Sequence, residues 1–152
     1  MTAALVARLR GLGQTVATAE SLTAGMVAAE LTSVPGSSAV LRGGLIVYAT
    51  ELKAKLAGVD PGLLTEHGPV HPDVAAQLAE GARERCGATW GLGLTGVAGP
   101  DPQGGVAPGT VYVAVAGPQG VEVRRLSLAG SRQDVRTGSV SAVLDLLRDR
   151  LR

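Results

Sequence analysis

Residues 14–34 read QTVATAESLTAGMVAAELTSV, and the pattern of this stretch changes after Glu20. Residues 14–20 are rich in β-branched side chains, which predicts a strand. Residues 21–34 have the composition of a helix, and Pro35 and Gly36 then end it. A strand that leads directly into a helix is typical of an α/β fold, and it places Ser21 at the junction between the two elements.

The flanking segments continue this alternation of helices and strands. Residues 2–11 carry apolar side chains at helical spacing and stop at a glycine, which predicts a helix. Residues 39–50, AVLRGGLIVYAT, predict a second strand. Residues 51–58, ELKAKLAG, predict a short helix in which Thr50 caps the start and Gly58 ends the last turn.

The second half of the sequence adds strands and a last helix. A segment of turn residues between Pro61 and Pro72 precedes a predicted helix over residues 73–86 and a strand over residues 88–96. Residues 96–109 form a long loop of glycine and proline, and compact domains usually keep such loops for function. The remaining predicted elements are a hairpin of strands over residues 109–117 and 120–130 and a helix over residues 131–152.

This order of elements predicts one α/β domain over residues 1–152, built as a three-layer sandwich. Strands separated by helices run parallel whereas a hairpin is antiparallel, so we expect a mixed, mostly parallel sheet with helices on both faces. Ligands of such sheets bind beyond the carboxyl ends of the strands. Ser21, Tyr48 and the segment from Thr95 to Gly99 all fall at that edge, where we expect the functional site.

Composition excludes several classes of function. The net charge is +1 and only three residues are aromatic, so the sequence lacks the basic face and stacking platforms of a nucleic-acid-binding protein. No apolar run approaches the roughly 18 residues of a membrane span and no signal peptide is present, so we expect a soluble, cytoplasmic protein. Cys86 is the only cysteine, and His67 and His71 lie in an irregular turn without an obvious third metal ligand. We therefore expect a small-molecule partner and no metal.

Ser21 and Lys53 are the candidate catalytic residues. Ser21 has two possible roles at the start of the following helix: it caps the helix, or its hydroxyl attacks the carbonyl of a substrate. A reciprocal capping box would need Glu or Gln three residues later, where Ala24 stands. Lysine occurs only at Lys53 and Lys55, although arginine serves every other basic position. A general base must lose its proton, which arginine cannot do, but two solvated lysines on an exposed helix are the alternative. Lys53 lies one helical turn past the strand end and is the favoured base, provided that burial lowers its pKa from about 10.4 toward 7.

Two further patterns have simpler explanations. The spacing Gly91-x-Gly93-x-x-Gly96 matches a dinucleotide fingerprint, but these residues belong to the predicted strand and no helix can begin in the proline-containing loop that follows, so we expect no Rossmann site. Asp101 either holds a ribose hydroxyl or stabilises a turn. Arg132, at the start of the last helix, either meets an anion or is solvated.

Five segments of the sequence together form a recognisable set of motifs. They are TAESLTAG, GGLIVYATELKAKLAGV, GLTGVAGPDPQGG, PGTVYVAVA and GSRQDVR. In order and spacing they resemble the CinA carboxy-terminal domain family, whose stand-alone members include nicotinamide-nucleotide amidases. The resemblance covers essentially the whole sequence, without the larger amino-terminal CinA domain. It implies an α/β sandwich that hydrolyses the carboxamide of nicotinamide mononucleotide to nicotinate mononucleotide and ammonia, in pyridine-nucleotide salvage, with no metal or organic cofactor.

The resemblance also implies residue roles. Ser21 corresponds to the nucleophile, Lys53 to the general base and Tyr48 to the family's tyrosine after the second strand. The implied nucleotide-binding residues are Thr95, Gly96, Gly99, Pro100 and Arg132.

The sequence departs from the family pattern near the nucleophile, where Leu22 and Ala24 replace the cysteine and glycine of an SCTGG motif. Ala24 adds a methyl group there. Two alternatives to an enzyme remain at this stage: a nucleotide-binding module without catalysis, and an interaction domain linked to competence or DNA damage. A homodimer is the expected assembly if the protein is not a monomer.

Overall fold

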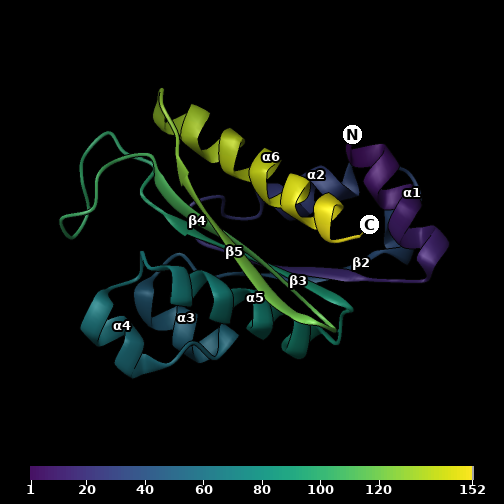
Figure 1. Ribbon diagram of the computed structural model, residues 1–152, viewed down its shortest axis with the longest axis horizontal. Coiled ribbons are helices and arrows are strands. Elements are labelled where there is room, and N and C mark those ends of the chain that lie inside the picture. The colour runs from purple at the N-terminus through teal and green to yellow at the C-terminus, as the bar shows by residue number, and fades with distance from the viewer. Residues whose placement is uncertain (152) are drawn as a thin grey trace.

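The computed structural model describes residues 1–151 and consists of one five-stranded sheet with helices on both sides (Figure 1). The helices are α1 (Thr2–Leu12), α2 (Met26–Thr32), α3 (Thr50–Ala57), α4 (Pro61–His67), α5 (Pro72–Cys86) and α6 (Arg132–Arg150), with a 3-10 turn at η1 (Ser37–Ala39). The strands are β1 (Val16–Glu20), β2 (Leu41–Ile46), β3 (Trp90–Gly96), β4 (Thr110–Gly117) and β5 (Gly120–Ser127).

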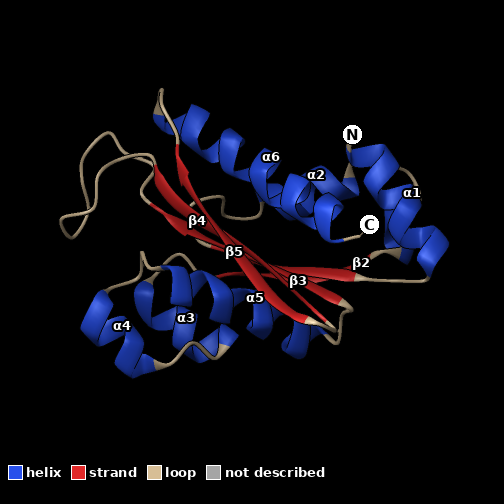
Figure 2. Cartoon of the chain, viewed as in Figure 1, coloured by secondary structure: helices blue, strands red, loops and turns tan. Residues whose placement is uncertain are grey.

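The strands, red in Figure 2, form one sheet. Its strand order is β2-β1-β3-β4-β5. β1 pairs in parallel with both β2 and β3, while β4 is antiparallel to β3 and to β5. Four of the five strands therefore point in one direction, so the predicted mixed, mostly parallel sheet is confirmed. The carboxyl ends of β2, β1 and β3 lie at one edge.

Helices cover both faces of the sheet, as the three-layer prediction requires (Figure 1). On one face α1, α2 and α6 enclose a core that includes Leu9, Leu31 and Leu147. On the other face α3, α4 and α5 pack over a second core. α5 lies so close to β3 that a Cβ at Gly93 would overlap the main-chain oxygen of Ala75, so this glycine serves helix packing. The fingerprint-like glycines belong to β3, as expected, and no helix follows them.

Three local predictions were wrong. The turn-rich segment after Asp60 contains α4, because the Asp60 carboxylate accepts the N–H of Gly62 and Pro61 occupies the first helical position. The helix expected from Ser21 begins only at Met26, after a tight turn. Thr50 is the first residue of α3 rather than its N-cap, which is Ala49.

The last helix agrees with its prediction within the described residues. Ser131 and Asp134 form a reciprocal capping box, which fixes the start of α6 at Arg132. Residue 152, the end of the predicted helix, lies outside the described part of the chain.

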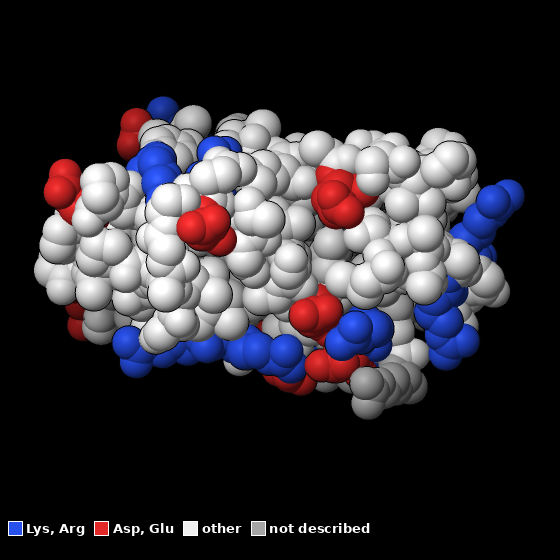
Figure 3. Space-filling model, turned by 90° about the horizontal axis from the view of Figure 1, so that it is seen from above, with Lys and Arg blue, Asp and Glu red and all other residues white. Residues whose placement is uncertain are grey.

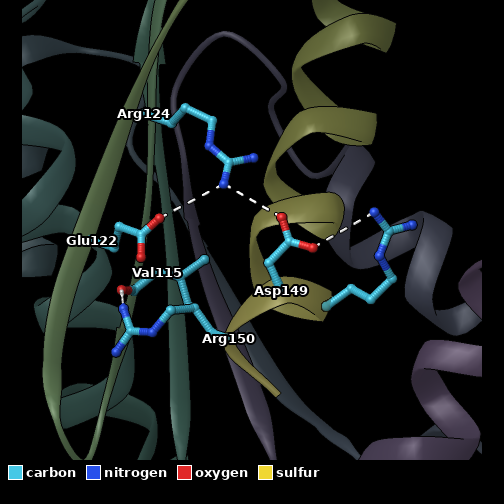
Figure 4. Close-up of polar contacts among 6 residues, drawn as sticks. Val115, Glu122, Arg124, Asp149 and Arg150 are labelled. Atoms are coloured by element: carbon cyan, nitrogen blue, oxygen red, sulfur yellow. Dashed lines mark hydrogen bonds and ion pairs between the residues drawn. The ribbon is translucent and has the colours of Figure 1, made fainter. Parts of the chain in front are cut away.

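A polar network ties the far end of α6 to the β4–β5 hairpin (Figure 4). Arg124 on β5 lies 3.5 Å from Asp149 and 3.7 Å from Glu122, and Arg150 donates to the main-chain oxygen of Val115 at 3.2 Å. These side chains are partly exposed, so each ion pair contributes only about 0–1 kcal/mol. They connect the hairpin to the end of α6 that lies opposite Arg132.

On the face formed by α1, α2 and α6, basic side chains lie mostly along the edges, whereas several acidic side chains lie within the face and are surrounded by uncharged surface (Figure 3). No helix within residues 1–151 is long and apolar enough to cross a membrane.

Candidate active site

A cavity of about 310 Å³ opens at the sheet edge where β1, β2 and β3 end. Its volume lies at the small end of the range for small-molecule sites. Every site residue predicted from the sequence lines it: Ser21, Tyr48, Lys53, Thr95, Gly96, Gly99, Pro100 and Arg132. The chain reaches this edge from the turn after β1, from α3, from the loop after β3 and from the start of α6, all at the left-hand end of Figure 1.

Ser21 and Lys53 are in direct contact at the base of this cavity. Lys53 Nζ lies 2.9 Å from Ser21 Oγ, and the two side chains are 1% and 7% exposed. Nζ also donates to the main-chain oxygens of Val47 at 2.8 Å and Tyr48 at 3.2 Å. Lys55 is exposed, so the geometry selects Lys53 from the two lysines.

The position of Lys53 follows from the pattern of α3. Lys53 and Ala57 are the buried residues of this helix, and their spacing of four residues puts them on one face. Lys55 projects from a different face. Because α3 begins directly after β2 and the short turn at Val47–Ala49, its buried face returns the amine to the strand ends.

Burial changes the protonation of Lys53. Loss of hydration lowers the pKa of this amine to about 8, against a smaller opposing effect of the Glu51 carboxylate. The sequence argument required a buried lysine with a lowered pKa, and the structure has one. The three acceptors around Nζ, the Ser21 hydroxyl and the carbonyls of Val47 and Tyr48, match the three N–H groups of the ammonium form. In the neutral form, two N–H groups suffice for the two carbonyls and the lone pair is left to accept the Ser21 O–H.

The turn that carries Ser21 is bound to strand β3 at its start. The Ser21 N–H donates to the main-chain oxygen of Leu94 on β3 at 3.2 Å. The next N–H groups, of Leu22 and Thr23, have no acceptor within residues 1–151, and Leu22 lines the cavity. Ala24, at a φ of 46°, is exposed and is not among the lining residues, so its methyl group does not enter the cavity.

Glu20 is the residue next to Ser21 that sequence reasoning missed. Its carboxylate is fully buried and accepts hydrogen bonds from the N–H groups of Val27 and Ala28 in the first turn of α2. These two N–H groups at the start of α2 are therefore occupied by Glu20 and are not free to bind an oxyanion. A carboxylate in the otherwise apolar, β-branched pattern of residues 16–20 was the signal that could have identified it.

Arg132 joins two segments at the rim of the cavity. Its guanidinium donates to the main-chain oxygen of Gly99 at 2.7 Å and to the hydroxyl of Tyr48 at 3.1 Å. The Tyr48 side chain is 59% exposed. Tyr48 therefore contacts Lys53 through its carbonyl, while its ring belongs to the rim.

The loop after β3 forms the opposite wall. The buried Thr95 hydroxyl donates to the main-chain oxygen of Pro69 at 2.7 Å and so fixes the Pro69–Val70 segment that also lines the cavity. Gly99 has a φ of 85° and precedes Pro100 in a cis peptide bond. Asp101 is an exposed lining residue.

The remaining candidates lie elsewhere or were not foreseen. His71 Nδ1 accepts the N–H of Asp73 and caps α5, and His67 stacks on it with ring centroids 4.5 Å apart. No cluster of three His, Cys, Asp or Glu suited to a metal occurs in residues 1–151. The cavity is also lined by Thr50 and Gln103, neither of which was predicted as a site residue.

Fold and site together define an α/β domain with a buried serine–lysine pair in a small polar cavity. Residues 1–151 match the CinA C-terminal domain, and the chain belongs to that family. A CinA-like protein of Frankia casuarinae is 51% identical over 134 residues, which cover 88% of this chain and 31% of that protein. The chain thus spans about a third of the length of the curated relatives it matches.

Solved structures agree with this assignment. The competence/damage inducible protein CihA from Agrobacterium tumefaciens has a TM-score of 0.91 and 32% identity, with 97% of this chain and 94% of that chain covered. A CinA superfamily protein from Klebsiella pneumoniae 700603 has a TM-score of 0.95 and 26% identity, with 99% and 94% covered.

Proposed function

We propose that this protein is a serine amidase that hydrolyses the carboxamide of nicotinamide mononucleotide to nicotinate mononucleotide and ammonia. The observation that carries the proposal is the 2.9 Å contact between Ser21 Oγ and the buried amine of Lys53. A helix-capping serine or a solvated lysine accounts for neither the burial nor the contact. The choice of substrate rests on the family resemblance.

The reaction begins with attack of Ser21 on the amide carbon. Neutral Lys53 takes the hydroxyl proton as Oγ forms a bond to that carbon, which gives a tetrahedral intermediate with a negative oxygen. Lys53, now an ammonium, returns the proton to the amide nitrogen. The C–N bond then breaks, ammonia leaves and Ser21 holds the nicotinoyl group as an ester.

Water completes the cycle by the reverse sequence of proton transfers. Lys53 removes a proton from a water molecule as its oxygen attacks the ester carbon, and Ser21 Oγ leaves with that proton. Nicotinate mononucleotide is released. Each step uses the same amine alternately as base and acid, which suits a pKa of about 8.

Main-chain N–H groups are suited to stabilise the negative oxygen. The N–H groups of Leu22 and Thr23 directly follow the nucleophile and have no acceptor within residues 1–151. Leu22 lines the cavity, whereas Thr23 is fully buried and is not a lining residue, so Leu22 is the donor of the two that can face the substrate. Preorganised donors of this kind contribute about 2.7–4 kcal/mol each when they face the developing charge. We assign this role to the turn after Ser21 in place of the end of α2.

The rim of the cavity suits the rest of the nucleotide. The exposed ring of Tyr48 offers an aromatic face to a cationic pyridinium ring. Arg132 has five N–H donors, and its two observed partners leave others for a phosphate. We place the carboxamide at Ser21 and the phosphate toward Arg132.

Release of ammonia from nicotinamide mononucleotide tests the proposal. The wild-type protein should release one ammonia per nicotinate mononucleotide formed, and Ser21→Ala should release none above background while it still binds the nucleotide. A non-catalytic nucleotide-binding module would bind the nucleotide with no ammonia from either protein.

A further inference from the structure

Glu20 presents an unusual buried charge beside the nucleophile. Its side chain is 0% exposed, and each carboxylate oxygen accepts two hydrogen bonds. Oε1 accepts the Thr23 hydroxyl at 2.7 Å and the Val27 N–H at 2.9 Å. Oε2 accepts the Thr18 hydroxyl and the Ala28 N–H, both at 3.1 Å.

These four donors take the place of a cation. No Lys, Arg or His within residues 1–151 forms an ion pair with Glu20, and an unpaired buried carboxylate would be costly without several donors. Gly44 on the neighbouring strand leaves room for the Thr18 hydroxyl that donates to Glu20, because a Cβ at Gly44 would overlap this hydroxyl. The carboxylate thereby links β1, the turn after it and α2 at a single point.

The linked turn is the one that carries Ser21. It contains consecutive left-handed residues, Ala24 with a φ of 46° and Gly25 with a φ of 100°. A non-glycine residue in this region costs about 1–2 kcal/mol, so the turn persists only where its surroundings hold it. Thr23 and Val27, on either side of these two residues, both donate to the same carboxylate oxygen.

We propose that Glu20 is a positioning residue that clamps the turn over residues 21–25 and so fixes Ser21 Oγ and the N–H group of Leu22 relative to the substrate carbonyl. The catalytic part of this inference rests on the proposed amidase function. The mechanical part, that Glu20 holds the turn, does not depend on any activity.

Glu20→Gln is the matched perturbation, because it keeps the volume and removes the charge. Whichever oxygen becomes NH₂, the hydroxyl that faced it can rotate and accept, but the N–H of Val27 or Ala28 then faces a donor. One clamp bond is therefore lost and one polar group is left buried without a partner. Glu30→Gln is the control, since Glu30 is an exposed carboxylate of α2 bonded only to the Thr2 hydroxyl.

Amide hydrogen exchange tests the clamp without reference to catalysis. Glu20→Gln should raise exchange in residues 21–28 by at least about tenfold while α5 keeps its protection, and Glu30→Gln should leave residues 21–28 unchanged. Unchanged exchange in residues 21–28 of Glu20→Gln overturns the proposal. This result is readable even if the wild-type protein releases no ammonia, in which case only the proposed function fails.

Kinetics test the positioning. Glu20→Gln should lower kcat by about 10- to 100-fold with KM within about twofold of wild type, because small misplacements of a nucleophile act mainly on the reacting step. The midpoint of the pH–rate profile should stay in place, and a shifted midpoint would mean that Glu20 acts through the charge of Lys53 instead. Wild-type kcat in a Glu20→Gln protein of reduced stability overturns the proposal in favour of a purely structural role.

A second pair of variants covers the case in which Glu20→Gln does not fold. Thr23→Val removes one donor to the carboxylate at nearly constant volume, whereas Thr23→Ser keeps the hydroxyl. Thr23→Val should lower kcat, and Thr23→Ser should restore most of it. Equal kcat values for the two variants would contradict the clamp.

Discussion

Replacement of Lys53 by arginine separates a general base from a simple buried cation. Lys53 has a pKa of about 8, so about one tenth of it is neutral at pH 7. An arginine stays protonated at that pH, so the neutral form that a base requires is almost absent. The loss of active base alone predicts a fall in kcat/KM of at least about 10,000-fold for Lys53→Arg, close to the effect of Lys53→Ala.

In the proposed mechanism the same pKa sets the pH dependence of ammonia release by the wild-type protein. The active form is the neutral amine, so kcat/KM should rise about tenfold per pH unit below pH 8 and become level above it. The measurement is the initial rate of ammonia release from nicotinamide mononucleotide between pH 6 and 10, for wild type, Lys53→Arg, Lys53→Ala and the control Lys55→Arg. Lys55 is exposed, and its replacement should leave the rate nearly unchanged.

Three results would refute this reasoning. Activity of a folded Lys53→Arg protein within tenfold of wild type would show that the amine does not need to lose its proton. A wild-type profile that is flat from pH 6 to 9 would show that no group with a pKa near 8 controls the reaction. Sensitivity of Lys55→Arg in place of Lys53→Arg would move the base to another residue.

Four further changes test separate parts of the site and the fold. Ser21→Ala should lower ammonia release by at least about 1,000-fold with an unchanged circular dichroism spectrum, and near-wild-type turnover would exclude the nucleophile. Arg132→Ala should raise KM for nicotinamide mononucleotide far more than for nicotinamide riboside, by a contact of about 1.5–3 kcal/mol, with equal losses arguing against a phosphate contact. Ala24→Gly should raise the free energy of unfolding by about 0.5–1 kcal/mol in urea titration, because it relieves a φ of 46°, and a loss of stability would contradict the strain. Gly93→Ala should destabilise by about 3 kcal/mol or more, since its Cβ would overlap the main chain of α5, and wild-type stability would refute that packing.

The fold was predictable because its strongest signals are local. Alternating strand and helix patterns gave the element order, and the parallel pairing of β1 with β2 and β3 followed from the helices between them. The start of α2 was not predictable, because residues 21–25 have helical composition while Glu20 and Gly25 enforce a turn. α4 was missed because Asp-Pro-Gly reads equally well as a turn or as a helix start.

The convergence of the candidate site was predictable for a topological reason. Parallel strands end at the same edge, so residues that follow different strands gather there irrespective of their distance in sequence. Which atoms meet was not predictable. Tyr48 illustrates this, since its carbonyl contacts Lys53 while its hydroxyl accepts from Arg132 more than 80 positions away.

Lys53 and Glu20 show why some functional residues can be recognised from sequence and others cannot. A lysine among arginines stands out because the two residue types differ in the property that a base needs, the ability to lose a proton. A buried carboxylate has no such contrast, because Glu is common on surfaces and its environment here depends on two hydroxyls and two N–H groups from three segments. The two charges also depend on opposite physical conditions. Poor solvation of Lys53 lowers its pKa, as the proposed base requires, whereas four donors around Glu20 compensate its burial and connect it to the turn that carries Ser21.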